Sequence, residues 1–194
     1  FELQLSNLEP LRTYYVRSYA KNDTGIGYGE NRSFTTLNDG TLISFEDKEF
    51  ETYCLENFDN NKDNFISIDE AKKITEINIF KKNISAIPEI QYFTSLKTLN
   101  CMVNQLTSLD ISGCTNLTTL HCSSNQLTSL DISGCTSLTT LDCIFNQLTS
   151  LDVSECPDLK DLSCVRNPLQ TLYVRKGQPV LTYNIESYTK IIYK

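Results

Sequence analysis

The second half of the sequence repeats every 21 residues, and this period constrains the fold more than any other feature. A shift of 21 superposes leucine on leucine, cysteine on cysteine and asparagine on asparagine: Leu96, Leu117, Leu138 and Leu159; Leu99, Leu120, Leu141 and Leu162; Cys101, Cys122, Cys143 and Cys164; Asn104, Asn125, Asn146 and Asn167. A single unit of this size buries too little apolar surface to offset the entropy of ordering its backbone. The units are therefore expected to stack as coils that share one core.

The repeating unit, L-x-x-L-x-C-x-x-N-x-L-x-x-L-D-I/V-S-x-C, resembles the leucine-rich-repeat consensus with cysteine at one inward position. The resemblance implies a solenoid over residues 74–179, with a degenerate first coil that runs from Ile74 to Ile87. The two halves of a unit, such as 117–122 and 127–132, are rich in β-branched threonine. This composition predicts strands on two sides of each coil and no helix on the convex face. Residues 180–194 are expected to form a C-terminal cap strand.

Seven of the eight cysteines fall on two columns of the repeat. One column is Cys101, Cys122, Cys143 and Cys164, and the other is Cys114, Cys135 and Cys156. Parallel side chains in stacked coils are nearly 5 Å apart, about 1 Å more than the Cβ separation that a disulfide prefers. We therefore expect buried free thiols, which behave as small apolar side chains.

An acidic segment precedes the repeats. Residues 59–70, DNNKDNFISIDE, resemble a twelve-residue EF-hand calcium loop, with Asn64 where that loop usually has glycine. The resemblance implies one structural calcium ion bound by the side chains of Asp59, Asn61, Asp63 and Glu70, the carbonyl of Phe65, and Ser67 directly or through water. Helical spacing of apolar residues before the loop predicts a helix-loop-helix N-cap over 45–73. The alternative is an Asx-rich helix connection that binds no metal.

The first 37 residues resemble the C-terminal part of a fibronectin type III domain. The residues that carry the resemblance are Leu8, Pro10, Thr13, Tyr15, Gly25, Gly29 and Ser33-Phe34-Thr35. It implies that Tyr15 is a corner tyrosine, that 25–30 is a hairpin, and that 38–44 is a linker. Because the early strands and their tryptophan are missing, we expect a poorly packed fragment of a longer polypeptide.

Composition and charge exclude several classes of function. A formal net charge of −7 without a basic cluster disfavours nucleic acid and anionic lipid as partners. No apolar run approaches the roughly 20 residues that a transmembrane helix needs, so no direct membrane insertion is expected in this segment. His121 is the only histidine and no nucleophile motif is present, so we expect no enzyme.

The positions around the first strand of each unit vary, whereas LTSLDIS recurs almost unchanged. Variation on a fixed frame is typical of a ligand surface, and the alternative is drift on a solvated face. The predicted ligand-binding surface is Asn100, Met102, Val103, His121, Ser123, Asp142, Ile144, Phe145, Ser163, Val165 and Arg166.

The predicted fold class is mainly β: a leucine-rich-repeat solenoid of 21-residue coils with strands on two sides, a short helix-loop-helix cap, and partial fibronectin type III-like strands before it. This combination resembles secreted or surface-anchored bacterial leucine-rich-repeat proteins. The resemblance implies adhesion, with a protein or glycan partner at the cell exterior. The alternative is a passive spacer that presents other domains of a longer polypeptide.

Overall fold

The computed structural model describes residues 5, 8, 12–36, 42–177 and 182–194, which belong to two compact units, 1–42 and 43–194. Pro10 of the fibronectin-like motif and residues 38–41 of the expected linker lie outside the described residues. The same holds for residues 178–181, at the expected boundary between the repeats and the cap strand.

The first unit contains two pairs of antiparallel strands in its described part. Strand β1 (Thr13–Val16) pairs with β4 (Arg32–Thr35), and β2 (Tyr19–Asn22) pairs with β3 (Gly25–Tyr28). The expected hairpin at 25–30 is wrong, because 25–28 is itself a strand. The turn comes earlier, where the Asn22 side chain accepts hydrogen bonds from the backbone N–H groups of Thr24 (3.0 Å) and Gly25 (3.1 Å).

Poor packing of this unit is confirmed. Tyr15, the expected corner tyrosine, is 75% exposed, and no described residue of the unit is in the buried core. Tyr14 and Phe34 stack on each other with ring centroids 5.9 Å apart. Two strands alone offer no second layer against which such rings can be buried.

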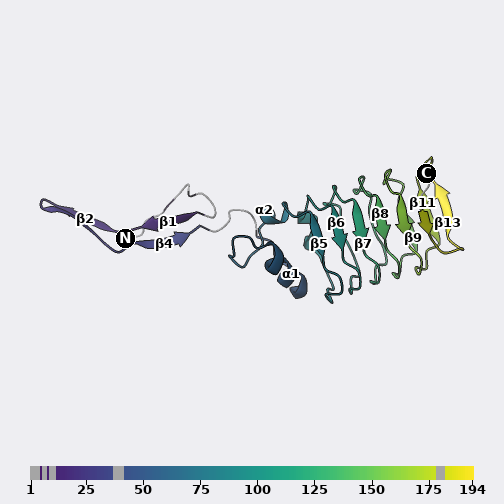
Figure 1. The fold of residues 1–194 in the computed structure, drawn as a ribbon, viewed down its shortest axis with the longest axis horizontal. Helices are drawn as coiled ribbons and strands as arrows, with labels where there is room; N and C mark the ends of the chain where they lie inside the picture. Colours follow the sequence, from purple (N-terminus) through teal and green to yellow (C-terminus); the bar gives the residue numbers. More distant parts are fainter. Residues whose placement is uncertain (1–4, 6–7, 9–11, 37–41, 178–181) are drawn as a thin grey trace. The chain divides into compact units, whose positions relative to one another are not determined.

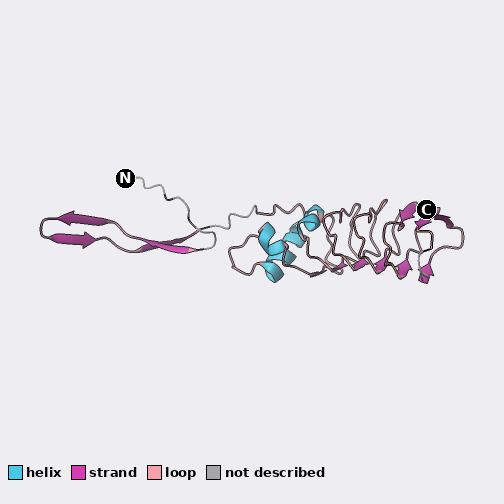
Figure 2. Ribbon diagram, turned by 90° about the horizontal axis from the view of Figure 1, so that it is seen from above, coloured by secondary structure: helices cyan, strands magenta, loops and turns pink. Residues whose placement is uncertain are grey.

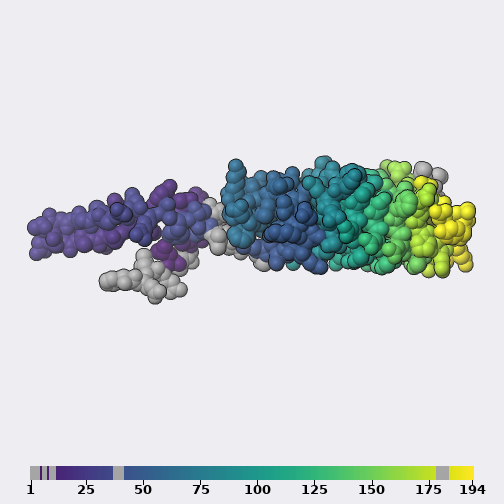
Figure 3. Space-filling model, turned by 90° about the horizontal axis from the view of Figure 1, so that it is seen from below, coloured from purple at the N-terminus to yellow at the C-terminus, as the bar shows by residue number. Residues whose placement is uncertain are grey.

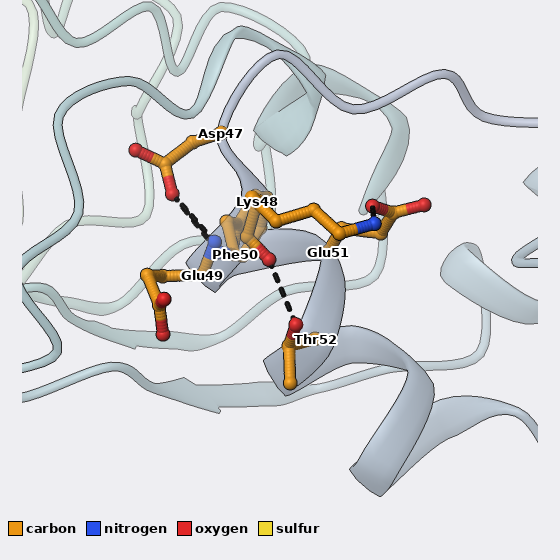
Figure 4. A network of polar contacts seen from close by, with 6 residues as sticks. All are labelled: Asp47, Lys48, Glu49, Phe50, Glu51 and Thr52. Carbon is orange, nitrogen blue, oxygen red and sulfur yellow. Dashed lines mark hydrogen bonds and ion pairs between the residues drawn. The ribbon is translucent and has the colours of Figure 1, made fainter.

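The second unit begins with a short helical cap. Helix α1 (Lys48–Phe58) starts at Asp47, whose carboxylate accepts hydrogen bonds from the backbone of Glu49 (2.9 Å) and Phe50 (3.1 Å) (Figure 4). The other oxygen of Asp47 accepts two hydrogen bonds from Ser85 in the first coil, at 2.7 and 2.8 Å. Partial burial acts to raise the pKa of Asp47, but these hydrogen bonds outweigh it and lower the pKa below its ordinary value. Asp47 thus fastens the cap to the solenoid.

Helix α1 covers the apolar end of the coil stack. Its buried residues Phe50 and Phe58 each lie 6.2 Å, between ring centroids, from Phe93 of the first coil. A second helix, α2 (Ile68–Ala71), and a 3₁₀ helix (Pro88–Tyr92) complete this end. Figure 2 shows the helices gathered at one end of the solenoid, with the coils following behind them. The cap shields a cross-section that would otherwise expose apolar side chains to water.

The first strand of each coil joins one parallel sheet of six strands. Its order is β12-β10-β8-β7-β6-β5, and its strands are β5 (Glu76–Asn78), β6 (Thr98–Asn100), β7 (Thr119–His121), β8 (Thr140–Asp142), β10 (Asp161–Ser163) and β12 (Thr182–Asn184) (Figure 1). Equivalent residues of the repeat face one another in register, so Leu99 pairs with Leu120 and Leu120 with Leu141. Residues 94–177 contain no helix.

Strands on the second side form only in the later coils, which corrects the sequence expectation. The second sheet has the order β13-β11-β9 and contains β9 (Ser150–Asp152), β11 (Thr171–Val174) and β13 (Lys190–Tyr193). The earlier coils have a single bridge there, between Asp110 and Asp131. The sequence explains the difference, because TLYV and KIIY are rich in β-branched and aromatic residues. TSLDIS instead carries Ser and Asp, which hydrogen-bond to their own backbone.

The recurring leucines and cysteines point inward, as predicted. Leu96, Leu117, Leu138 and Leu159 are fully buried, and both cysteine columns are equally buried with every thiol free. In the space-filling view the successive coils lie in contact with no gap on the face shown (Figure 3). Burial raises the pKa of Cys101 to about 12 and that of Cys135 to about 11, so both thiols stay protonated at neutral pH.

A ladder of buried asparagines holds neighbouring coils together. The side-chain amide of Asn146 donates to the carbonyl of Cys143 in its own coil (3.0 Å) and to that of Cys122 in the preceding coil (3.1 Å). Its side-chain oxygen accepts from the backbone N–H of Leu127 (3.0 Å). Asn125 and Asn167 repeat this pattern. The ladder therefore satisfies backbone groups that are buried inside the turns.

A matched pair of glycine substitutions tests how closely the coils approach. A Cβ atom on Gly113 would lie 2.2 Å from the carbonyl oxygen of Gln91, whereas a Cβ on Gly134 would lie 3.3 Å from that of Ser112. We expect Gly113→Ala to lower the free energy of unfolding by about 2 kcal/mol, since rigid backbone has to shift. Gly134→Ala is the control and should cost less than about 1 kcal/mol. Equal urea midpoints for the two variants would contradict this close approach.

Candidate functional site

The outward side chains of the six-stranded sheet form a column of polar residues. Strand pairing aligns Asn100 with His121, His121 with Asp142, and Asp142 with Ser163. All four are half-buried and belong to the predicted ligand-binding surface. The structure therefore brings these four predicted residues together on one face.

Two of these residues also shape the turn that follows their strand. The Asn100 side chain accepts a hydrogen bond from the N–H of Met102, and that of Asp142 accepts one from Ile144, both at 3.2 Å. These are Asx turns, in which a side chain replaces a backbone acceptor. Asn100 and Asp142 therefore have a structural role in addition to any contact with a partner.

Next to the polar column, each turn has one residue in the left-handed conformation. The φ angles are 55° to 59° at Lys81, Val103, Ser124, Phe145 and Arg166. Val103 is 38% exposed and Phe145 is 53% exposed. The guanidinium carbon of Arg166 lies 4.9 Å from the centre of the Phe145 ring. We call Phe80, Lys81, Val103, Phe145 and Arg166 the turn ridge.

The remaining predicted surface residues are less accessible. Met102, Ile144 and Val165 are half-buried beside the turn ridge. Ser123 is only 3% exposed, which corrects its assignment to the surface. Its hydroxyl donates to the Asp142 carboxylate, and this hydrogen bond holds the side chain inside the turn.

Phe80 and Lys81 are the surface residues that sequence reasoning missed. Phe80 is 48% exposed and precedes the left-handed Lys81. The first coil is degenerate and its step to the next coil is 22 residues, so these positions do not align at a shift of 21. A shift of 22 places Phe80 on Met102 and Lys81 on Val103.

The uniform aspartate column on the other side is architectural. Asp110, Asp131 and Asp152 each accept a hydrogen bond, at 3.0 Å, from the backbone of the serine two residues later. The backbone bond from Ser112 lowers the pKa of Asp110. The column is exposed to solvent, which keeps the repulsion between neighbouring carboxylates small.

The acidic loop is folded by its own side chains. The Asp59 carboxylate accepts from the backbone of Asp63 (3.2 Å) and Asn64 (2.9 Å), and Asn61 accepts from Asp63 at 3.0 Å. Asn64 has a φ of 65°, the left-handed conformation for which this position of an EF-hand loop uses glycine. The carbonyl of Phe65 was predicted as a ligand, and its side chain is 49% exposed.

The last two predicted ligands meet in a capping box. Ser67 begins helix α2, and the buried Glu70 carboxylate accepts from its N–H (3.0 Å) and its hydroxyl (2.9 Å). Among the described residues, no three His, Cys, Asp or Glu side chains lie close enough together to hold a metal ion. Within the same residues no helix is long and apolar enough to span a membrane.

Comparison with known proteins identifies the repeat. The family model described as leucine-rich repeats, two copies, matches residues 94–135 and 115–153. No curated protein matches the chain. Three solved structures from Listeria monocytogenes are similar to it. The functional domain of InlJ, which includes a cysteine ladder, is 38% identical with a TM-score of 0.65, over 70% of this chain and 31% of that one. The chain thus spans about a third of that structure's length.

The other two are more distant. The internalin InlF is 21% identical with a TM-score of 0.47, over 77% of this chain and 55% of that one. The internalin C2 is 19% identical with a TM-score of 0.49, over 77% and 93%. Together, the family model and the InlJ domain show that the coils are leucine-rich repeats and support a bacterial leucine-rich-repeat protein.

Proposed function

We propose that this protein is a non-catalytic adhesion-type protein that binds another protein or a glycan outside the bacterial cell. One observation carries the proposal: apolar side chains at varied positions are exposed on a frame whose other columns are uniform. Phe145 and Val103 are exposed on the turn ridge, next to the polar column of Asn100, His121 and Asp142. A passive spacer has no need for such a patch, since exposed apolar clusters on soluble proteins mark contact sites.

An array of extracellular-matrix proteins and glycans probed with the full chain tests this proposal. We expect at least one spot to bind the chain, and Phe145→Ser to weaken that binding. Ser129→Ala, on the uniform side of the same solenoid, is the matched control and should leave binding unchanged. Failure of every spot to retain the chain would favour the spacer instead.

We also propose that the acidic loop binds one calcium ion, which would stabilise the cap. The donor set supports this proposal, because Asp59, Asn61, Asp63 and Glu70 offer only oxygen atoms, as a hard cation prefers. The left-handed Asn64 supports it as well. Glu70 would share its carboxylate between the ion and the hydrogen bonds from Ser67.

Calcium at about 100 times its dissociation constant should stabilise the folded protein by about 2.7 kcal/mol, which thermal melting with and without a chelator measures. Glu70→Gln is a sharp test, because glutamine keeps an acceptor for Ser67 in the capping box while it removes the charge. The variant should melt like the chelated wild type with or without calcium. An unchanged wild-type midpoint at millimolar calcium would leave the loop as a metal-free helix connection.

We further propose that the first unit is the C-terminal part of a fibronectin type III-like sandwich. Strand register supports this proposal, because the Tyr14–Phe34 pair and the Tyr19–Tyr28 pair put aromatic rings directly across the ribbon. Neighbouring pairs such as Thr13–Thr35 and Ala20–Gly27 are small or polar. A ribbon with alternating apolar and polar pairs is typical of a sheet that covers a core on one side.

A further inference from the structure

The turn ridge places apolar side chains where the backbone disfavours them. A residue with a φ near 57° is normally glycine, asparagine or aspartate, and a β-branched residue there is an outlier. This protein uses asparagine for the same conformation at Asn64 and Asn83. At Val103 (φ 57°) and Phe145 (φ 56°) it has bulky apolar residues instead.

Neither side chain is needed by the core. Val103 and Phe145 are substantially exposed, and Ser124 occupies the same position in the coil between them. Ser124 shows that the turn forms around a small polar residue. Strain that folding does not require is a reason to look for a function.

Backbone hydrogen bonds hold the ridge in place. The N–H of Val103 donates to the carbonyl of Ser123 (2.9 Å), and the N–H of Phe145 donates to that of Val165 (3.1 Å). Lys81 makes the equivalent bond to Met102 at 3.0 Å. Each ridge residue is thus fixed to the next coil, and four steps of about 4.8 Å give a rigid row of about 19 Å. An extended segment of about six residues has this length.

The charged residues of the ridge are cationic, on a chain whose formal net charge is −7. Among the described residues neither Lys81 nor Arg166 forms an ion pair. The nearby acids already have donors: Asp142 accepts from Ser123 and Ile144, and Glu186 accepts from the backbone N–H of Arg166. Free cations beside exposed rings complement a partner that is both acidic and apolar.

We propose that the turn ridge is the contact surface for an extended polypeptide segment that carries apolar and acidic side chains. This inference rests on the proposed binding function and names the partner class. Apolar side chains of the segment would pack on Val103 and on the open face of the Phe145 ring, while its carboxylates would pair with Lys81 and Arg166.

Two fluorescent peptides of twelve residues provide the probe. Both have the same leucine and phenylalanine positions, and the remaining positions are all glutamate in one peptide and all lysine in the other. Titration of the full chain, followed by fluorescence anisotropy, should show binding of the glutamate peptide that is at least about tenfold tighter than that of the lysine peptide, and that weakens with salt.

Serine variants locate the contact. Val103→Ser and Phe145→Ser copy the residue found at position 124, so folding is retained, and each should weaken the glutamate peptide by about tenfold. Tyr193→Ser removes an aromatic side chain that is 66% exposed away from the ridge, and should change nothing. Equal binding of both peptides, or binding of the glutamate peptide that survives Phe145→Ser, would overturn the inference.

The array separates this inference from the proposed function. If a spot binds the chain and Phe145→Ser has no effect, the binding function stands and the ridge assignment falls. If the only binder is a glycan that Phe145→Ser abolishes, the ridge is a site but the polypeptide partner is wrong. If the glutamate peptide binds through the ridge while the array stays empty, the inference stands and the proposed natural partners are wrong.

Discussion

Raising the pH from 8 to 10 is expected to lower the free energy of unfolding by about 5 kcal/mol, through the buried thiols alone. Burial raises the pKa of Cys101, Cys114 and Cys156 to about 12 and that of Cys135 to about 11, from an ordinary value of 9.0. Above pH 9 the unfolded chain loses these protons while the folded chain keeps them. Each thiol therefore stabilises the fold fully below pH 9, and this contribution falls until the pH passes the folded-state pKa. At pH 10 the loss is about 1.4 kcal/mol for each thiol.

Urea unfolding at pH 8, 9 and 10, with a reductant present and followed by circular dichroism, measures this loss. Other groups also titrate in this range, so a variant has to isolate one thiol. Cys101→Ile is suitable because Ile79 fills the equivalent position in the first coil. Its loss between pH 8 and pH 10 should be smaller than that of the wild type by about 1.4 kcal/mol, whatever its stability at pH 8. Identical losses would mean that Cys101 does not stay protonated in the fold.

Replacing Asn146 with alanine should lower the free energy of unfolding by about 3–5 kcal/mol. The substitution leaves the N–H of Leu127 and the carbonyls of Cys122 and Cys143 without the hydrogen bonds that Asn146 makes. Each buried group that loses its partner costs about 1–3 kcal/mol. The lost bonds join two coils, so the change should lower the stability of the whole stack.

Gln147→Ala is the control for Asn146→Ala, since it removes an exposed amide from the next position in the chain. Its effect should stay within about 0.5 kcal/mol. Equilibrium urea unfolding compares the two variants at pH 7. A loss for Asn146→Ala as small as that of the control would mean that water replaces the amide without cost and that the ladder does not hold the coils.

Periodicity predicted the parts of this fold that depend on stacking. A residue that recurs every 21 positions meets its own copy in the next coil, so the inward leucines, the cysteine columns and the buried asparagines followed from sequence alone. Spacing does not fix which backbone groups on the second side pair as strands. That choice depends on local competition, and in the earlier coils Ser and Asp compete with strand pairing.

The candidate surface was predictable as a set of varied positions, but not residue by residue. Ser123 varies like its neighbours, yet a hydrogen bond to Asp142 draws it inward. Phe80 belongs to the surface, although the irregular first step hides its alignment. The left-handed conformation at Val103 and Phe145 has no sequence signal, since neither residue prefers it. Metal binding by the acidic loop stays a prediction.

The asparagine ladder also restricts how such a protein can change in length. Each asparagine spans two coils, so removal of 21 residues from the middle of the array, such as 117–137, would bring Asn146 to the place of Asn125 with its partners intact. Removal of 20 residues would instead set every later leucine, cysteine and asparagine one position out of step. Insertions and deletions from unequal recombination can then survive only as whole turns, and the length of the solenoid grows or shrinks in discrete steps.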